Sequence, residues 1–243
     1  MEIYVGASGY GYKEWKGVFY PERISPKEML RFYAERLGAV EINNTFYRMP
    51  TERVLASWAE QVPDAFVFAF KAPQVITHFK RLRNVESETE YLLRTLAVLA
   101  GRLGPLLFQF PKTFQADPLA LRAFLALIPA GSMSFAFEFR SETWLDEGIL
   151  TLLREKGCSL CIEDSDEVPA NEIISTATWG YLRLRRSDYT DAELSTWMER
   201  ILSQKWEKAF VFFKHEGEAK GPEMAIRFRG LIDSRGRTER KPR

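Results

Sequence analysis

The 243-residue sequence predicts an α/β protein built as a single (β/α)8 TIM barrel with a shortened sixth helix. Eight short segments rich in aromatic and β-branched residues are typical of buried strands, and they begin roughly 30 residues apart. Segments with a 3.6-residue apolar period, typical of amphipathic helices, lie between them. This alternation favours a closed parallel barrel over an open doubly wound sheet, which would need a glycine-rich phosphate loop after its first strand.

The predicted strands are four to eight residues long, which is the usual length of a buried strand. They cover residues 3–7, 39–43, 66–71, 106–110, 134–140, 159–164, 180–185 and 209–215. Only about 15 residues separate strands six and seven, which is too short for a full helix and its two loops. We therefore expect a stunted helix near residues 169–176.

Capping residues mark where the intervening helices begin. Serine, threonine or aspartate before an apolar-periodic segment supplies a side-chain acceptor for the first free backbone N–H groups, and proline fits the first helical turn. Such signals occur at Ser25-Pro26, Thr51, Ser87, Asp117-Pro118, Ser141, Thr190 and Gly221-Pro222. The sequence thus predicts a helix after every strand, within one domain over residues 1–233.

Composition excludes two classes of protein. Hydrophobic residues make up 46% of the chain, which is ample for a packed core and excludes general disorder. The most apolar stretch, residues 92–100, contains Arg94 and is far shorter than the about 20 residues needed to cross a bilayer, so no membrane partner is expected. The chain runs from Met1 into the first strand without a signal peptide, which predicts a cytoplasmic location.

Charge is balanced overall but uneven along the chain. There are 34 basic and 33 acidic residues, whereas residues 225–243 hold seven basic and two acidic ones. We interpret residues 234–243 as a flexible basic tail, either a solubilising end or an attachment for nucleic acid. Cys158 and Cys161 lie in residues 157–164, which are interpreted as extended chain around the predicted strand 159–164. An odd offset places the two side chains on opposite faces, so both are expected as reduced core residues.

Alternation along the strands places polar side chains in the lumen of the barrel, near the carboxyl ends where barrel enzymes carry their chemistry. Burying this many charges in an inert barrel would be costly without partners. Two interpretations remain open: a self-neutralised structural layer, or a ligand site formed by the same residues. The inward polar set is Glu41, Asn43, Lys71, Gln109, Glu138, Arg140, Arg183 and Arg185.

Further candidates lie at the same rim. Asp164 ends strand six, whose phase is ambiguous because Glu163 and Asp164 face opposite ways. His78 and His215 follow strands three and eight, and Tyr47 and Trp144 belong to a group of aromatic residues that could either stack on a ligand or roof the barrel. The spacing of histidine and cysteine argues against zinc, whereas Glu41, Glu138 and Asp164 could hold Mg²⁺ or Mn²⁺.

Four motifs in order resemble the YecE-like family, domain of unknown function 72. They are Asn43-Asn44-Thr45-Phe46-Tyr47; Phe70-Lys71-Ala72-Pro73 with Ile76-Thr77-His78; Leu103 through Pro111; and Glu138-Phe139-Arg140 with Trp144. The resemblance implies a TIM barrel similar to metal-dependent sugar isomerases and abasic-site endonucleases, although this chain lacks their several histidine ligands. The last strand of the family often ends in paired asparagines, where this sequence has Lys214-His215.

These observations favour an enzyme, in the manner of a hydrolase or phosphoesterase, that binds a small anionic, phosphate-bearing molecule at the carboxyl mouth of the barrel. Arg140, Arg183 and Arg185 would hold the anion, since arginine contacts phosphate with two hydrogen bonds at once. Glu41 and Glu138 would serve as acid and base, Asp164 would orient a water or a metal, and Lys71 would add a charge or act as a Schiff-base nucleophile. The alternatives are a nucleic-acid-binding protein and a non-catalytic scaffold.

Overall fold

In the computed structural model, eight parallel strands close into a barrel in sequence order, each strand pairing with its neighbours along the chain. The structure describes residues 1–129, 131, 133–170, 172–214 and 217–239. The strands are β1 (Glu2–Ser8), β2 (Ala39–Ile42), β3 (Val67–Lys71), β4 (Leu103–Gln109), β5 (Phe135–Glu138), β6 (Ser159–Asp164), β7 (Trp179–Leu184) and β8 (Lys208–Phe213). The predicted TIM barrel is therefore confirmed.

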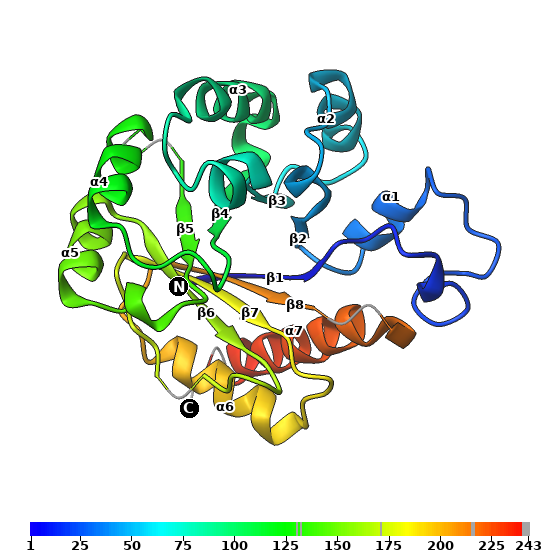
Figure 1. Cartoon of the computed structure of the whole chain (residues 1–243). Helices are drawn as coiled ribbons and strands as arrows, with labels where there is room; N and C mark the ends of the chain where they lie inside the picture. Colours follow the sequence, from blue (N-terminus) through cyan, green and yellow to red (C-terminus); the bar gives the residue numbers. More distant parts are fainter. Residues whose placement is uncertain (130, 132, 171, 215–216, 240–243) are drawn as a thin grey trace.

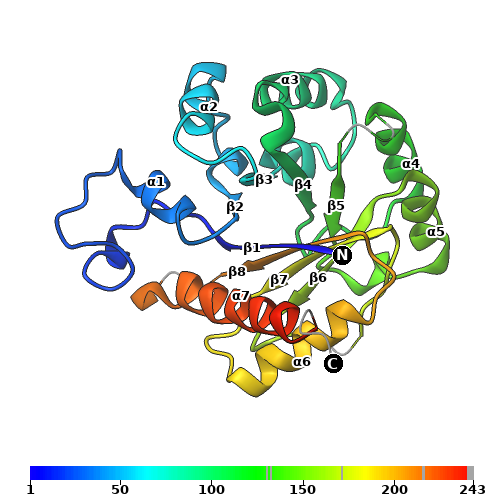
Figure 2. The same cartoon turned by 180° about the vertical axis from the view of Figure 1, so that it is seen from behind.

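Helices cover the outside of the barrel (Figure 1). The α-helices are α1 (Met29–Ala34), α2 (Glu52–Ala59), α3 (Glu86–Leu96), α4 (Pro118–Leu127), α5 (Glu147–Lys156), α6 (Asp191–Leu202) and α7 (Lys220–Glu239). Short turns of helix are η1 (Lys13–Trp15), η2 (Asn44–Phe46), η3 (Val75–Phe79), η4 (Ala97–Arg102), η5 (Glu142–Trp144) and η6 (Gly217–Ala219). Seen from behind, the long segment between β1 and α1 extends away from the barrel (Figure 2).

Several capping predictions match the structure. Thr51 and Asp117 accept hydrogen bonds from the backbone at the starts of α2 and α4, and Thr190 forms a complete capping box with Glu193. Ser87 does not cap α3, which begins one residue earlier at Glu86 and is preceded by Val85. A capping residue in the sequence therefore locates the start of a helix only to within one or two residues.

Two predicted segments differ in the structure. Residues 165–178, of which all but 171 are described, form a loop between β6 and β7 and contain no helix. The shortened sixth helix is thus reduced to irregular backbone. Helix α7 continues to Glu239, so the predicted boundary at residue 233 does not coincide with the end of the helix, and residues 240–243 lie outside the described part of the chain.

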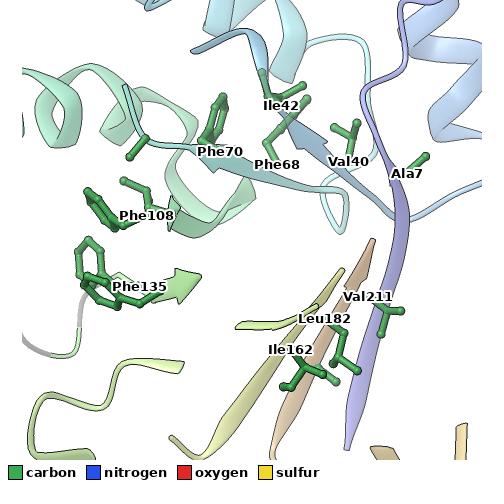
Figure 3. Close-up of a cluster of buried hydrophobic side chains, with 14 of the residues drawn as sticks. Ala7, Val40, Ile42, Phe68, Phe70, Phe108, Phe135, Ile162, Leu182 and Val211 are labelled. Carbon is green, nitrogen blue, oxygen red and sulfur yellow. The ribbon is translucent and has the colours of Figure 1, made fainter. Parts of the chain in front are cut away.

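Two apolar layers hold the barrel. The outer layer packs the strands against the helices, and Figure 3 shows that every strand contributes to it, from Ala7 on β1 to Val211 on β8. The inner layer fills the lumen with Ala39, Val67, Ala69, Leu107, Ala136, Cys161, Tyr181, Phe210 and Phe212. The predicted inward phase of β2, β3, β5 and β7 is therefore confirmed. Cys158 belongs to the outer layer and Cys161 to the inner one, and both thiols are free, as predicted.

Candidate functional site

Above the apolar filling of the lumen, Arg183 forms the centre of a buried polar layer. Its Nε and Nη2 groups donate to the two carboxylate oxygens of Glu41, at 2.9 and 3.0 Å. Its Nη1 group donates to Oε2 of Glu138 at 2.6 Å. None of the three side chains is more than 2% exposed. One arginine thus neutralises two carboxylates contributed by β2 and β5.

The other acceptor positions of these carboxylates are also occupied. Glu41 accepts hydrogen bonds from Ser8, Tyr181 and Asn43, at 2.6, 2.9 and 2.9 Å, and the side-chain amide of Gln109 donates to Glu138 at 2.6 Å. Burial by itself raises a carboxyl pKa. Here the charge of Arg183 and the hydrogen bonds outweigh burial and hold the pKa of both Glu41 and Glu138 below the usual range.

Glu41 and Glu138 are therefore fixed anions with saturated coordination. The expectation that these two residues form the acid and base pair does not fit this geometry, because a proton donor or acceptor must be able to reach the substrate. The buried layer instead matches the self-neutralised interpretation, with Arg183 as the main cation.

The open part of the mouth holds a different carboxyl group, Glu163 on β6. The phase of β6 turns Cys161 and Glu163 inward, and the Glu163 carboxyl lies next to that of Glu138. Burial and the adjacent Glu138 charge raise the pKa of Glu163, while Arg185 and Arg140 act more weakly in the opposite direction. When two neighbouring carboxyl groups have pKa values shifted in opposite directions, the one with the lower pKa commonly stays an anion and the one with the higher pKa can donate a proton.

Asp164 faces the opposite way and lies outside the lumen. It is fully buried and accepts hydrogen bonds from the backbone N–H of Ala170, the hydroxyl of Tyr189 and the guanidinium of Arg186, at 2.9, 2.8 and 3.0 Å. The predicted role of Asp164 in orienting a water or a metal at the mouth is wrong, because odd and even residues of a strand point to opposite faces. Asp164 instead anchors the loop after β6 and the loop after β7.

Lys71, the last residue of β3, lies half-buried at the mouth. Its Nζ atom lies 3.9 Å above the centre of the Phe46 ring, and among the described residues no carboxylate comes within 4.0 Å of it. Burial lowers the pKa of the Lys71 ammonium to about 8; Arg183 and Arg140 add to this effect, and Glu138 and Glu41 oppose it. The free amine of Lys71 is therefore far more accessible near neutral pH than that of an ordinary lysine, whose pKa is about 10.4.

We expect an NMR titration of ¹³C-methylated protein to give a Lys71 pKa of about 8. Arg140→Met should raise this pKa because it removes a neighbouring cation, whereas Arg94→Met on the exposed face of α3 should leave it unchanged. Since the folded-state pKa lies below the ordinary lysine value of about 10.4, the contribution of Lys71 to stability should rise as the pH increases between these two values. A measured pKa near 10.4 would contradict this description of the mouth.

His78 and Tyr47 border Lys71 on the side of β2 and β3. His78 belongs to η3, a single π-helical turn of a kind often found at functional sites, and its ring meets the edge of Phe46 with centroids 4.8 Å apart. Burial lowers the pKa of His78 to about 4, helped by Lys71, Arg140 and Arg81. His78 is therefore a neutral hydrogen-bonding group at this site. Tyr47 is largely exposed and packs against Phe46.

Arg140 and Arg185 follow the ends of β5 and β7. The Nε atom of Arg140 contacts Glu138 at 3.2 Å, and its two terminal nitrogens make no hydrogen bond to any described residue. Arg185 pairs with Glu163 through Nη1. Arg140 is thus the arginine whose hydrogen-bonding capacity is directed to the open mouth, whereas Arg183 is fully used within the protein.

Trp144 lies away from the mouth. It is fully buried, its indole N–H donates to the carbonyl oxygen of Phe114 at 2.7 Å, and its ring is stacked on Phe139 with centroids 4.8 Å apart. No ligand could reach it, so the predicted binding role of Trp144 is wrong and the roofing interpretation applies to it. His215 lies outside the described residues.

A cavity of about 790 Å³ opens beside the polar layer. Strands β5 and β6 pair at only two positions, Ala136 with Ser159 and Phe137 with Leu160, so the upper half of β6 has no β5 partner. The cavity lies at this separation and along the loop after β6. Its polar lining includes Glu138, Arg140, Glu163 and Arg185. Neither Glu163 nor Phe46 is assigned a role from the sequence, where Glu163 has an ambiguous phase and Phe46 stands in a family motif. The inward phase of Cys161 identifies Glu163 as a residue of the mouth.

The described part of the chain contains no cluster of three histidine, cysteine or acidic side chains that could hold a metal ion. The predicted Mg²⁺ or Mn²⁺ set of Glu41, Glu138 and Asp164 is not brought together, because Asp164 faces the helices and Arg183 occupies the other two carboxylates. Likewise, the described helices include none that is both long and apolar enough to cross a bilayer.

Comparison with known families confirms the resemblance that the four sequence motifs indicated. The family model described as "Protein of unknown function DUF72" matches residues 4–243. The chain belongs to the DUF72 family. Among solved structures, a DUF72 protein from Thermotoga maritima is 27% identical to it, with a TM-score of 0.83 over 96% of this chain and all of that chain.

Curated relatives of this DUF72 protein support the same assignment. The UPF0759 protein YecE of Escherichia coli is 31% identical over 174 residues, which is 69% of this chain, and YunF of Bacillus subtilis is 26% identical over 175 residues, or 66% of this chain. The chain spans 61% of the length of each of these relatives.

Proposed function

We propose that this DUF72 protein is an enzyme that binds a small anionic, phosphate-bearing substrate at the carboxyl mouth of the barrel and transfers a proton to it. The observation that carries the proposal is the contrast between two levels of the polar lumen. In the lower level every charge is paired within the protein. In the upper level, Arg140 and Glu163 line a cavity, and Lys71 at the end of β3 has no carboxylate within 4.0 Å among the described residues.

Each of these three residues has a role that its surroundings support. The terminal nitrogens of Arg140 provide two parallel donors that suit a phosphate or carboxylate group. Lys71 adds a second positive charge nearby. Glu163, whose pKa is raised by burial and by Glu138, is the proton donor, and Glu138 remains an anion that Arg183 fixes in place.

Isothermal titration of inorganic phosphate into the wild-type protein tests the proposal. We expect saturable binding that weakens about tenfold or more in Arg140→Met, since a charge-assisted hydrogen bond contributes about 1.5–3 kcal/mol. Lys208→Met, at the opposite end of the barrel, is the matched control and should bind phosphate as the wild type does. Wild-type protein that binds no phosphate, or equal binding by Arg140→Met, would contradict the proposal.

Nucleic-acid binding is the second candidate, favoured by two aromatic side chains at the rim. Tyr47 and Phe79 are 76% and 71% exposed; in the sequence, Tyr47 directly precedes Arg48 and Phe79 stands shortly before Arg81. Exposed aromatic rings beside cations can stack on single-stranded bases. This candidate predicts a steep loss of oligonucleotide affinity with salt and a further loss in Tyr47→Ala, without any change in phosphate binding.

A further inference from the structure

The ammonium group of Lys71 lies in unusual electrostatic surroundings. Two carboxylates lie near it, but Arg183 takes the hydrogen bonds of both, and two guanidinium groups, those of Arg183 and Arg140, act on it as like charges. Both parts of Lys71 have a contact: Phe46 lies beneath Nζ of the side chain, and the hydroxyl of Thr45 donates to the backbone carbonyl oxygen of Lys71 at 2.6 Å. A lysine beside other cations, without a carboxylate partner, has the properties of an amine nucleophile.

We propose that Lys71 forms an imine with the carbonyl carbon of a small anionic substrate whose anionic group is bound by Arg140. This inference rests on the proposed function and names its substrate class, which is an aldehyde or ketone that carries a carboxylate or a phosphate. A lysine with a mobile side chain would be sufficient if Lys71 only contributed its positive charge to anion binding. The position of Lys71 over an aromatic ring, with no described carboxylate within 4.0 Å, is what an attacking amine requires.

The residues of the mouth supply each part of the reaction. The nitrogen lone pair of the Lys71 amine attacks the carbonyl carbon, the C–N bond forms, and the carbonyl electron pair moves to oxygen. That oxygen leaves as water, taking one proton from the amine and one from the Glu163 carboxyl, and a protonated imine remains. Glu163, then a carboxylate, regains its proton from solvent. No oxidant, reductant or metal is consumed in these steps.

The positions of Lys71 and Glu163 fit a substrate placed between them. They lie on β3 and β6, on opposite sides of the mouth, and both act electrostatically on Glu138 and Arg140. A molecule bound to Arg140 would thus have the amine on one side and the acid on the other. The cavity beside Glu163 has room for a substrate of a few carbon atoms.

Trapping with sodium borohydride tests the inference, because reduction converts an imine into a stable secondary amine. The full-length protein is incubated with pyruvate in one arm and dihydroxyacetone phosphate in the other, reduced, digested and mapped by mass spectrometry. We expect one adduct per chain, on Lys71, in at least one arm. The arm that reacts identifies the anionic group as carboxylate or phosphate.

Three variants sharpen the experiment. Lys71→Arg keeps the positive charge but cannot form an imine, so it should bind phosphate and lose the adduct. Lys208→Arg, at the other end of the barrel, should retain it. Glu163→Gln should slow trapping by about a hundredfold or more, since a positioned general acid typically contributes about 10²–10⁴-fold to the step that it assists. An unchanged rate would overturn the role of Glu163.

The outcomes separate this inference from the proposed function. Failure to modify Lys71 in both arms, or modification of Lys208 to the same extent as Lys71, would overturn imine formation. If phosphate binding by the wild type persists in that case, only the substrate class falls. If phosphate binding is absent as well, both the inference and the proposed function fail.

Discussion

Replacing Arg183 with methionine is expected to lower the free energy of unfolding by about 3–5 kcal/mol, which is the usual cost of removing one partner from a buried ion pair. The variant keeps a side chain of similar length but leaves the buried Glu41 carboxylate without a cation and leaves Glu138 with only the Nε contact of Arg140. Denaturant unfolding monitored by circular dichroism measures the loss. Arg185→Met, at a partly exposed pair, is the control and should lose about 1 kcal/mol or less.

The pH dependence of Arg183→Met should also be reversed. In the wild type the pKa values of Glu41 and Glu138 lie below those of the unfolded chain, so their contribution is lost as the pH falls through the folded values. Without Arg183, burial should raise the pKa of Glu41, whereas Arg140 still opposes this effect at Glu138, so the variant should gain stability through Glu41 as the pH decreases from 7 to about 5. Adding Glu41→Gln should recover part of the loss. A variant that unfolds like the wild type would show that the layer is not under electrostatic control.

Asp164→Asn is expected to be the second most destabilising substitution, with a loss of about 3 kcal/mol. The buried carboxylate accepts from three donors, and the amide group of asparagine would place N–H groups against at least one of them. Phosphate binding should remain unchanged, because Asp164 faces the helices. Glu167→Gln, on the exposed loop after β6, is the matched control for charge loss. A loss of binding with retained stability would instead support the original catalytic assignment of Asp164.

The fold was predictable because it depends on patterns that are repeated along the whole chain. Eight short apolar strands and their caps define the barrel, and alternation along β5 and β7 places Glu138 and Arg183 in the lumen. The loop that replaces the sixth helix was only half predictable: its shortness followed from the strand spacing, but its conformation depends on Asp164 and Ala170, which lie six residues apart and form a tertiary contact.

The site was less predictable, since alternation gives the direction of a side chain and not its partners. Arg183 forms ion pairs with both Glu41 and Glu138, and only the Nε atom of Arg140 contacts Glu138. This choice of partners depends on how the strands are placed relative to one another, which the sequence pattern does not give. Trp144 illustrates the same limit. An aromatic residue after a strand can either line the mouth or pack over the end of the barrel. The hydrogen bond of Trp144 to the Phe114 carbonyl and its stacking on the Phe139 ring show that it packs.

We propose that the lower polar level stabilises the barrel and that the upper level binds a ligand. The thermal unfolding midpoints of the wild type and Arg140→Met, each with and without phosphate, separate these two roles. At a phosphate concentration tenfold above the dissociation constant, linkage predicts a rise of about 3–6 °C for the wild type. We predict that Arg140→Met unfolds near the wild-type temperature without phosphate and shows no such rise. A large drop in the midpoint of Arg140→Met, together with no effect of phosphate on the wild type, would contradict the claim and leave a self-paired scaffold.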